Sequence, residues 1–261
     1  MTYSAVSAKI RAMQGRFLTD TDFSQLAFSD SVSAAVETLK SRPSYSCAFE
    51  AAGDGELDRS RIEQLLWLSL YRDYSSLYRF AAVSQRKFLD LYFMHFEVDI
   101  LKKCLRDAAS SRSSDLDLSI FEDFFQKHSH LAGLAECRSL DSFVEGLRGS
   151  FYYEPLRRLR DQGVTALFDY ESALDSLYFI HLWKDMKKQL GRKELEAVSQ
   201  CIGEKIDLLN LEWLSRAKEY YRLSDHAIED FLIPVYYKLR KDQIRAMAQA
   251  ASREEFLGIL R

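Results

Sequence analysis

Two aspartates that lie inside apolar helical runs are the residues of this chain most able to do chemistry. Asp99 stands in the run Val98-Asp99-Ile100-Leu101, and Asp207 stands in the run Ile206-Asp207-Leu208-Leu209. A carboxylate in such surroundings is costly to bury unless it is paired, and it acts as a general base only beside a poised partner and a pocket. Because both acids recur in matching surroundings, we expect a structural ion pair or hydrogen bond between helices. The candidate partners on the preceding long helices are Arg72, Arg79, Lys184 and Lys187.

No other pattern in the sequence indicates catalysis or a cofactor. The chain lacks a glycine-rich phosphate loop, a dinucleotide-binding glycine motif, a nucleophile elbow and the paired histidines of zinc proteases. His128 and His130 stand two residues apart, so on a helix they would point in different directions and could not chelate one metal ion. We therefore predict no catalytic, cofactor-binding or metal site.

The four cysteines, Cys47, Cys104, Cys137 and Cys201, are far apart in the sequence. None of them forms the close pair that a zinc site or a redox motif needs. We expect reduced and mostly buried thiols, as in a cytosolic protein. We expect no signal peptide, because Met1–Ile10 has no continuous apolar core, and the sequence has no apolar run of the ~20 residues that cross a bilayer. Any membrane role is therefore expected to come through a partner.

Composition favours a helical protein without nucleic-acid partners. Of 261 residues, 47% are apolar, which is enough for a sizeable core, and the net charge of −3 lacks the basic surplus of a nucleic-acid binder. With only 10 glycines and 3 prolines, the chain favours long helices over a turn-rich β fold.

Apolar residues at steps of three and four predict the helices that must position the two aspartates. The expected N-caps are Thr19 or Asp20, Ser31 or Ser33, and Asp58. The expected long helices are at about 59–83, 84–105, 167–189 and 193–221, and the final ones are at about 237–250 and 252–261.

One stretch of the chain recurs. Leu26–Lys40 reads LAFSDSVSAAVETLK, and Leu134–Arg148 reads LAECRSLDSFVEGLR, 108 positions later and without a gap. A weaker echo, Met247–Arg261, follows after 113 further positions. Asp99 and Asp207 share the 108-residue spacing, which predicts a repeat architecture.

The repeats define the expected domain organisation. We predict repeat 1 over 1–108, a polar serine-rich linker over 109–118, repeat 2 over 119–223, and the start of a truncated repeat 3 over 224–261. Because the helical pattern is still running at Arg261, we expect a longer parent protein.

Charged residues elsewhere have simpler interpretations. Glu37 and Glu145 stand three residues before Lys40 and Arg148, which favours local helix ion pairs over partner contacts. The segment Lys184-Asp185-Met186-Lys187-Lys188 is typical of a solvated face, and a docking surface for an acidic partner is the alternative.

The stretch Gly203–Leu211, with Trp213–Lys218 after it, resembles the helix motif of the C subunit of archaeal and bacterial V-type (A-type) ATPases. The eukaryotic equivalent is the d subunit of the vacuolar proton pump. The matching residues are Glu204, Asp207, Asn210, Arg216 and Lys218. The opening stretch Tyr3–Met13 is also similar to the family's first helix. Lys102 stands where the first-repeat counterpart of Asn210 belongs, which departs from the pattern.

The resemblance implies an all-α, funnel-like array of three similar helical repeats, of which about two and a fraction are present here. Proteins of this kind are a non-catalytic part of the central stalk. They join the axle, made of the D and F subunits, to the membrane rotor ring on the cytoplasmic face, and they couple ATP chemistry to H⁺ or Na⁺ transport. They reach the membrane only through the ring. Within this family Asp99, Asp207, Asn210 and Arg216 are expected to be structural polar residues.

Two other functions fit the sequence less well. The first is a generic α-helical repeat scaffold that recruits other proteins. The second is a helical hydrolase that uses Asp99 or Asp207 as its base.

Overall fold

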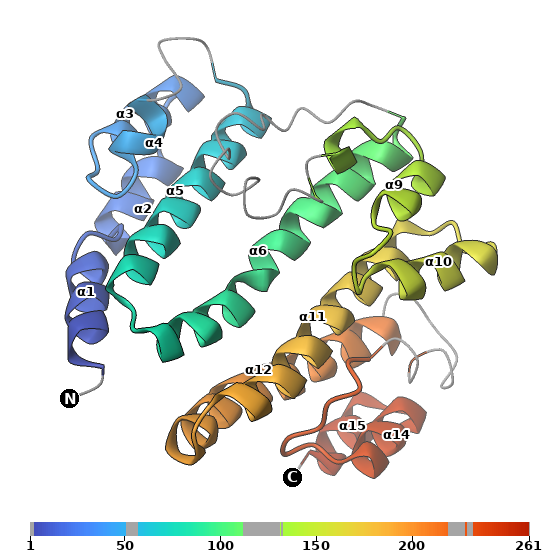
Figure 1. Cartoon of the computed structure of the whole chain (residues 1–261). Coiled ribbons are helices and arrows are strands. Elements are labelled where there is room, and N and C mark those ends of the chain that lie inside the picture. Colours follow the sequence, from blue (N-terminus) through green and yellow to red (C-terminus); the bar gives the residue numbers. More distant parts are fainter. Residues whose placement is uncertain are drawn as a thin grey trace. The chain divides into compact units, whose positions relative to one another are not determined.

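The computed structural model describes residues 3–50, 57–111, 131, 133–218, 228 and 232–260. These residues form helices and turns and include no strand, which confirms the predicted all-α class (Figure 1). The helices are α1 (Ser4–Gln14), α2 (Asp20–Ala27), α3 (Val32–Lys40), α4 (Ser46–Glu50), α5 (Arg59–Phe80), α6 (Val83–Ala109), η2 (Gly133–Glu136), α9 (Leu140–Gly146), α10 (Tyr153–Asp161), α11 (Leu167–Gln189), α12 (Arg192–Arg216), α14 (Lys241–Gln249) and α15 (Arg253–Ile259).

Contacts divide the chain into two compact units. The first comprises 1–86 with 115–132, and the second comprises 87–114 with 133–261. Repeats are defined by sequence similarity and units by contacts, so the repeat boundaries remain a prediction. The predicted linker, 109–118, lies mostly outside the described residues.

The first unit is built on α5. This helix contacts α1 and α4, and α3 contacts α2 and α4. Phe49 of α4 and Leu65 of α5 are fully buried, so their packing supplies the centre of this core. Asp58 accepts a hydrogen bond from the N–H of Arg61 at 2.8 Å and caps α5, as predicted.

The second unit is built on the long hairpin of α11 and α12. α10 contacts both α9 and α11, and the fully buried rings of Tyr152 and Tyr170 lie in this core. The part of α6 beyond Arg86 also belongs to this unit, and two ion pairs join it to α11. Lys102 Nζ lies 2.5 Å from Asp175 Oδ1, and Arg106 binds both carboxylate oxygens of Glu171.

Three serines cap helices at the spacing of the predicted repeats. Ser31, Ser139 and Ser252 precede α3, α9 and α15, and each hydroxyl accepts a backbone N–H from three residues later at 3.1 Å. Their numbers differ by 108 and then by 113, as the recurring stretch requires. The recurring stretches therefore start their helices at equivalent residues.

The local ion pairs expected at the ends of two of these stretches are present. Lys40 lies 2.9 Å from Glu37, and Arg148 pairs with Glu145. Glu145 also binds Arg160 at 2.8 Å. Hydrogen bonds from Arg160 and Arg148 lower the pKa of Glu145 to about 2.

The prediction of mostly buried thiols is wrong. All four cysteines are free, but only Cys104 is buried; Cys47 and Cys201 are exposed and Cys137 is intermediate. Burial raises the pKa of Cys104 to about 12, so this thiol stays protonated. The exposed thiols stand on the outer faces of their helices, and spacing alone could not distinguish those faces.

Candidate functional site

The polar centre of the second unit is a joint between α12 and the non-helical segment that precedes α14. We call it the α12 joint; it comprises Asp207, Asn210 and the backbone of residues 233–239. Asp207 and Asn210 stand three residues apart, so one face of α12 presents both side chains to the same segment. Asp207 is 6% exposed and Asn210 is 1% exposed.

Asp207 binds backbone amides rather than a basic side chain. Its Oδ1 accepts the N–H of Tyr237 at 3.2 Å, and its Oδ2 accepts the N–H groups of Lys238 at 2.6 Å and Leu239 at 3.1 Å. Three donors therefore compensate the cost of burying the charge. The donors differ from the expected lysines, Lys184 and Lys187.

This use of backbone N–H groups explains one misplaced helix start. The sequence predicts a helix over 237–250, but α14 begins at Lys241. The N–H groups of Tyr237, Lys238 and Leu239 point to the Asp207 carboxylate, and the segment that carries them bends around it instead of forming a helix. The tertiary contact outweighs local helix propensity here.

Asn210 holds the beginning of the same segment. Its amide nitrogen donates to the carbonyl oxygens of Ile233 at 3.0 Å and Val235 at 3.5 Å. Its oxygen accepts the N–H of Ile233 at 2.9 Å. The side chain thus pairs with Ile233 as a neighbouring strand would, which fixes the path of the chain as it leaves the core.

Gly203 lets the segment approach the helix. It lies one turn before Asp207 on α12, and a Cβ at this position would meet the Tyr237 ring at 2.3 Å. The ring therefore rests directly on the backbone of α12. Beside it, Lys238 Nζ lies 2.6 Å from Glu204, at the exposed edge of the α12 joint.

Lys218 makes a second polar contact with the third helical stretch. Its ammonium donates to the carbonyl oxygens of Met247 at 3.1 Å, Ala248 at 2.5 Å and Ala250 at 2.6 Å. These carbonyls end α14, where a helix carries unpaired acceptors and partial negative charge. Lys218 therefore ties the stretch after α12 to the end of α14. The resemblance includes this lysine, but no spacing rule identifies its acceptors.

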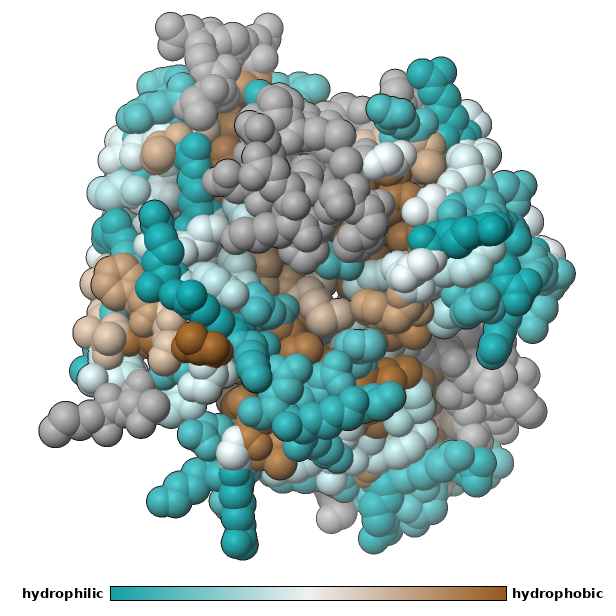
Figure 2. All heavy atoms as spheres, in the orientation of Figure 1, coloured by the Kyte–Doolittle hydropathy of each residue, from teal (hydrophilic) through white to brown (hydrophobic). Residues whose placement is uncertain are grey.

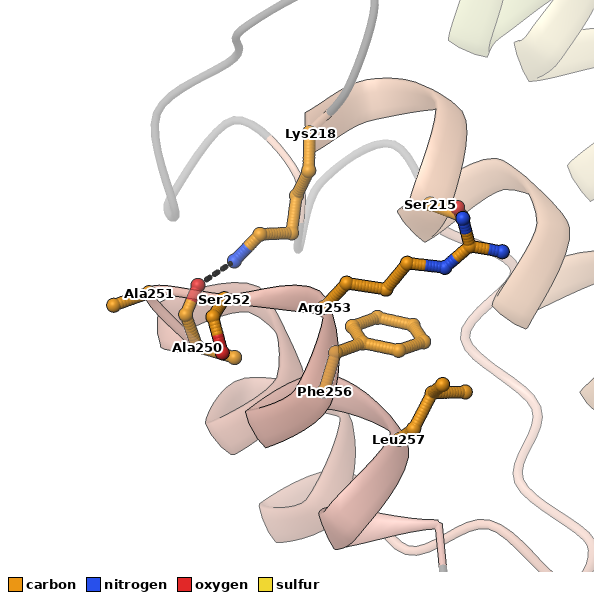
Figure 3. Close-up of a pocket in the computed structure, with 8 residues that line it drawn as sticks. All are labelled: Ser215, Lys218, Ala250, Ala251, Ser252, Arg253, Phe256 and Leu257. Carbon is orange, nitrogen blue, oxygen red and sulfur yellow. Dashed lines mark hydrogen bonds between the residues drawn. The ribbon is translucent and has the colours of Figure 1, made fainter.

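A pocket of about 300 Å³ opens beside Lys218 (Figure 3). Its walls come from the end of α12 and the residue Lys218 after it, from the turn between α14 and α15, and from α15 itself. Figure 3 shows the Arg253 side chain extending toward Ser215, with Phe256 and Leu257 beside it. The lining residues are Ser215, Lys218, Ala250, Ala251, Ser252, Arg253, Phe256 and Leu257.

Arg216 lies outside the α12 joint. Its guanidinium pairs with Glu212 one turn earlier at 2.7 Å, and its side chain is 61% exposed. An exposed pair at this spacing supports the helix only slightly. The structure therefore brings together Asp207 and Asn210 but not Arg216.

Asp99 has different surroundings from Asp207, although the sequence pairs them. It lies on the exposed side of α6, yet partial desolvation raises the pKa of its carboxyl, while His95, Lys102, Arg106 and Lys205 counteract this effect. The stretch 108 residues before the α12 joint, 125–131, lies mostly outside the described residues. At the position equivalent to Asn210, Lys102 instead pairs with Asp175 on α11.

The described residues hold neither a cluster of metal ligands nor a membrane span. Among the ranges that the structure describes, no group of three or more histidine, cysteine or acidic side chains could hold a metal ion. His128 and His130 lie outside those ranges. No helix in the described part of the chain combines the length and apolar character needed to cross a bilayer.

Comparison with known proteins relates the whole chain to one family. A family model described as ATP synthase (C/AC39) subunit matches residues 6–261. The C subunit of the A-type ATP synthase of Pyrococcus abyssi is 27% identical over 260 residues, which cover 99% of this chain and 67% of the relative. The proteins of the same name from Methanosphaera stadtmanae and Methanocaldococcus jannaschii are each 23% identical, over 98% of this chain and 64% of the relative.

The chain spans about two thirds of the length of these relatives. The match nevertheless includes α12, the α12 joint and both helices after it. Since it extends over residues 6–261, the chain belongs to the ATP synthase (C/AC39) subunit family.

Proposed function

We propose that this chain is a subunit of a rotary A-type or V-type ATPase and couples its central axle to its membrane ring. The observation that carries the proposal is the family match along residues 6–261, together with relatives that are named as the C subunit of A-type ATP synthase. The partners are the D and F subunits of the axle on one side and the ring subunits on the other. The place of action is the cytoplasmic face of the membrane.

A coupling protein must resist twisting, and several contacts in the second unit serve that purpose. The ion pairs of Lys102 with Asp175 and Arg106 with Glu171 fix the register of α6 against α11. The α12 joint then holds the chain segment that leads to α14. Paired polar groups in partly buried positions accept few alternative arrangements, so they favour one rigid geometry.

The role is structural rather than catalytic in this proposal. Backbone N–H groups occupy three of the roughly four lone-pair sites of the Asp207 carboxylate, and the residue is only 6% exposed, so a substrate has little access to it. The geometry thus favours a structural role for Asp207, in which it holds the segment before α14 against α12. ATP chemistry belongs to other subunits of the complex.

Co-purification tests this proposal. The tagged full chain, expressed with the D and F subunits and the ring subunits, should retain both the axle and the ring after solubilisation in mild detergent. An unrelated helical repeat protein with the same tag is the control. If neither the axle nor the ring is retained, the coupling role is wrong and a general scaffold becomes the better explanation.

A further inference from the structure

The turn between α11 and α12 carries a concentration of positive charge that the proposed function does not use. We call it the basic tip; it comprises Lys184, Lys187, Lys188, Arg192 and Lys193. Residues 184–194 hold these five cations and two acids, a net charge of +3, although the whole chain has a net charge of −3. All five cationic residues are exposed.

The basic tip lies at the free end of a long hairpin. α11 ends at Gln189 and α12 begins at Arg192, so both helices present their cations at one turn (Figure 1). Figure 2, in the same orientation, shows long hydrophilic side chains projecting from this end.

Internal pairing uses little of this charge. Asp185 pairs with Lys188 at 3.1 Å and also lies 3.3 Å from His181. Lys187 lies over the Trp183 ring, 4.6 Å from its centroid. In the part of the chain that the structure describes, no ion pair involves Lys184, Arg192 or Lys193. Most of the charge is therefore available to a partner.

Fold stability accounts for only part of the basic tip. Lys187 and Lys188 stand in the last turn of α11, where cations complement the helix dipole. Arg192 and Lys193 stand in the first turn of α12, where the dipole disfavours cations. That helix also starts from Gly191 without a side-chain cap. The positions of Arg192 and Lys193 therefore do not stabilise the fold.

The residue types indicate the partner. The whole chain has 22 arginines and 14 lysines, but the basic tip has four lysines and one arginine. Arginine suits carboxylates in defined positions because its planar fork binds them in a bidentate manner. Lysine is a flexible point charge that needs no fixed acceptor geometry, and clusters of such cations are typical of proteins that bind anionic lipid surfaces.

We propose that the basic tip binds anionic lipid headgroups directly, so that this protein touches the membrane surface as well as the ring. The resemblance alone implies membrane contact only through the ring, and the basic tip adds a second point of contact. Each cation near an anionic surface strengthens binding about fivefold at low salt, and the effect falls off within a Debye length. Vesicle binding by the chain alone does not depend on the proposed coupling role.

The test is co-sedimentation of the full chain with phosphatidylcholine vesicles, with or without about one part in four phosphatidylglycerol. We expect binding to the anionic vesicles alone, and its loss as salt is raised. The double variant Arg192→Gln/Lys193→Gln should bind about 25-fold more weakly. Because it removes cations from a helix N-terminus, it should also melt no lower than the unmodified chain.

A matched variant distinguishes the effect of charge at the basic tip from the effect of the net charge of the whole chain. Arg158→Gln/Lys241→Gln removes two exposed cations of the same unit outside the basic tip, and it should bind as the unmodified chain does. Equal binding to both vesicle types, or equal losses in the two double variants, would overturn the proposal. A third outcome would also contradict the proposal. If Arg192→Gln/Lys193→Gln binds vesicles as the unmodified chain does but no longer co-purifies with the ring subunits in detergent, the partner is an acidic protein surface.

Discussion

Replacing Asp207 with asparagine tests the α12 joint most sharply, because it preserves the shape of the side chain while removing its charge. An asparagine can offer one oxygen to the N–H groups of Lys238 and Leu239, which now share Oδ2. Its amide group then faces the N–H of Tyr237, and that hydrogen bond is lost. The other two bonds lose their charge assistance.

The magnitude follows from these three bonds. A hydrogen bond to a charged group contributes about 1.5–3 kcal/mol and a neutral one about 0.5–1.5 kcal/mol. Water can reach part of the segment, since Tyr237 is 37% exposed, and it will replace some of what is lost. We therefore expect Asp207→Asn to lower the free energy of unfolding by about 2–3 kcal/mol.

The assay is urea unfolding followed by tryptophan fluorescence, with hydrogen exchange of residues 237–239 as the local measurement. Glu204→Gln is the matched control, because it removes a charge one turn earlier on the same helix, where the pair with Lys238 is exposed. Its loss should be much smaller. Equal effects of the two substitutions, with unchanged exchange at residues 237–239, would refute the reasoning.

Three further predictions concern the same fold. Gly203→Ala should destabilise the protein by about 1–3 kcal/mol because a Cβ would meet the Tyr237 ring, whereas Gly258→Ala in open space should stabilise it by about 0.5–1 kcal/mol; thermal melting compares them. Ser139→Ala should cost about 1 kcal/mol by uncapping α9, and a Ser139→Gly loss of only a few tenths would support this cause. The pKa of Asp99 in the folded chain is raised above its ordinary 3.8, so the folded state holds this proton more tightly than the unfolded state does. The free energy of unfolding therefore falls as pH rises from 3.8 through the folded pKa. Asp99→Asn should therefore gain stability relative to the unmodified chain over that window in pH-dependent unfolding, and a constant difference at all pH values would contradict it.

Helical periodicity and capping residues predict much of the fold. The bounds of α11 agree with the expected 167–189, and Ser31 and Asp58 cap the helices that they were expected to start. Helix bounds and N-caps depend on residues that are close in sequence, so a local sequence pattern is enough to predict them. The α-helical part of α12 ends at Arg216 and a π turn continues over 217–218, so the predicted end at 221 lies outside the described residues.

The candidate site could be predicted only in part. Asp207 was identifiable because a carboxylate inside an apolar run needs a partner, but its partners are backbone N–H groups about 30 residues later. Backbone donors have no sequence signature, so no pattern could select them over a lysine. The acceptors of Lys218 are backbone carbonyl groups, and the sequence could not predict them for the same reason. Gly203 could have been found, since a glycine inside a helical pattern often marks a close approach.

Exposure of individual faces was the least predictable property. Cys47 and Cys201 lie on surfaces that the sequence gives no reason to leave open. Asp99 and Asp207 occupy equivalent positions in the sequence but have different surroundings, because Asp207 is buried and Asp99 lies at an exposed position. Similar sequence in two repeats predicts similar helices, but different neighbours then decide which residues become buried.

We propose that this chain couples ATP hydrolysis to ion movement, and a reconstituted complex tests this proposal most directly. Vesicles containing the complete complex, with the chain present or omitted, would be supplied with ATP while hydrolysis and ion uptake are measured together. We predict that omission abolishes ion uptake while hydrolysis by the soluble head continues, and that adding the chain back restores uptake. Ion uptake that proceeds equally well without the chain would contradict the account.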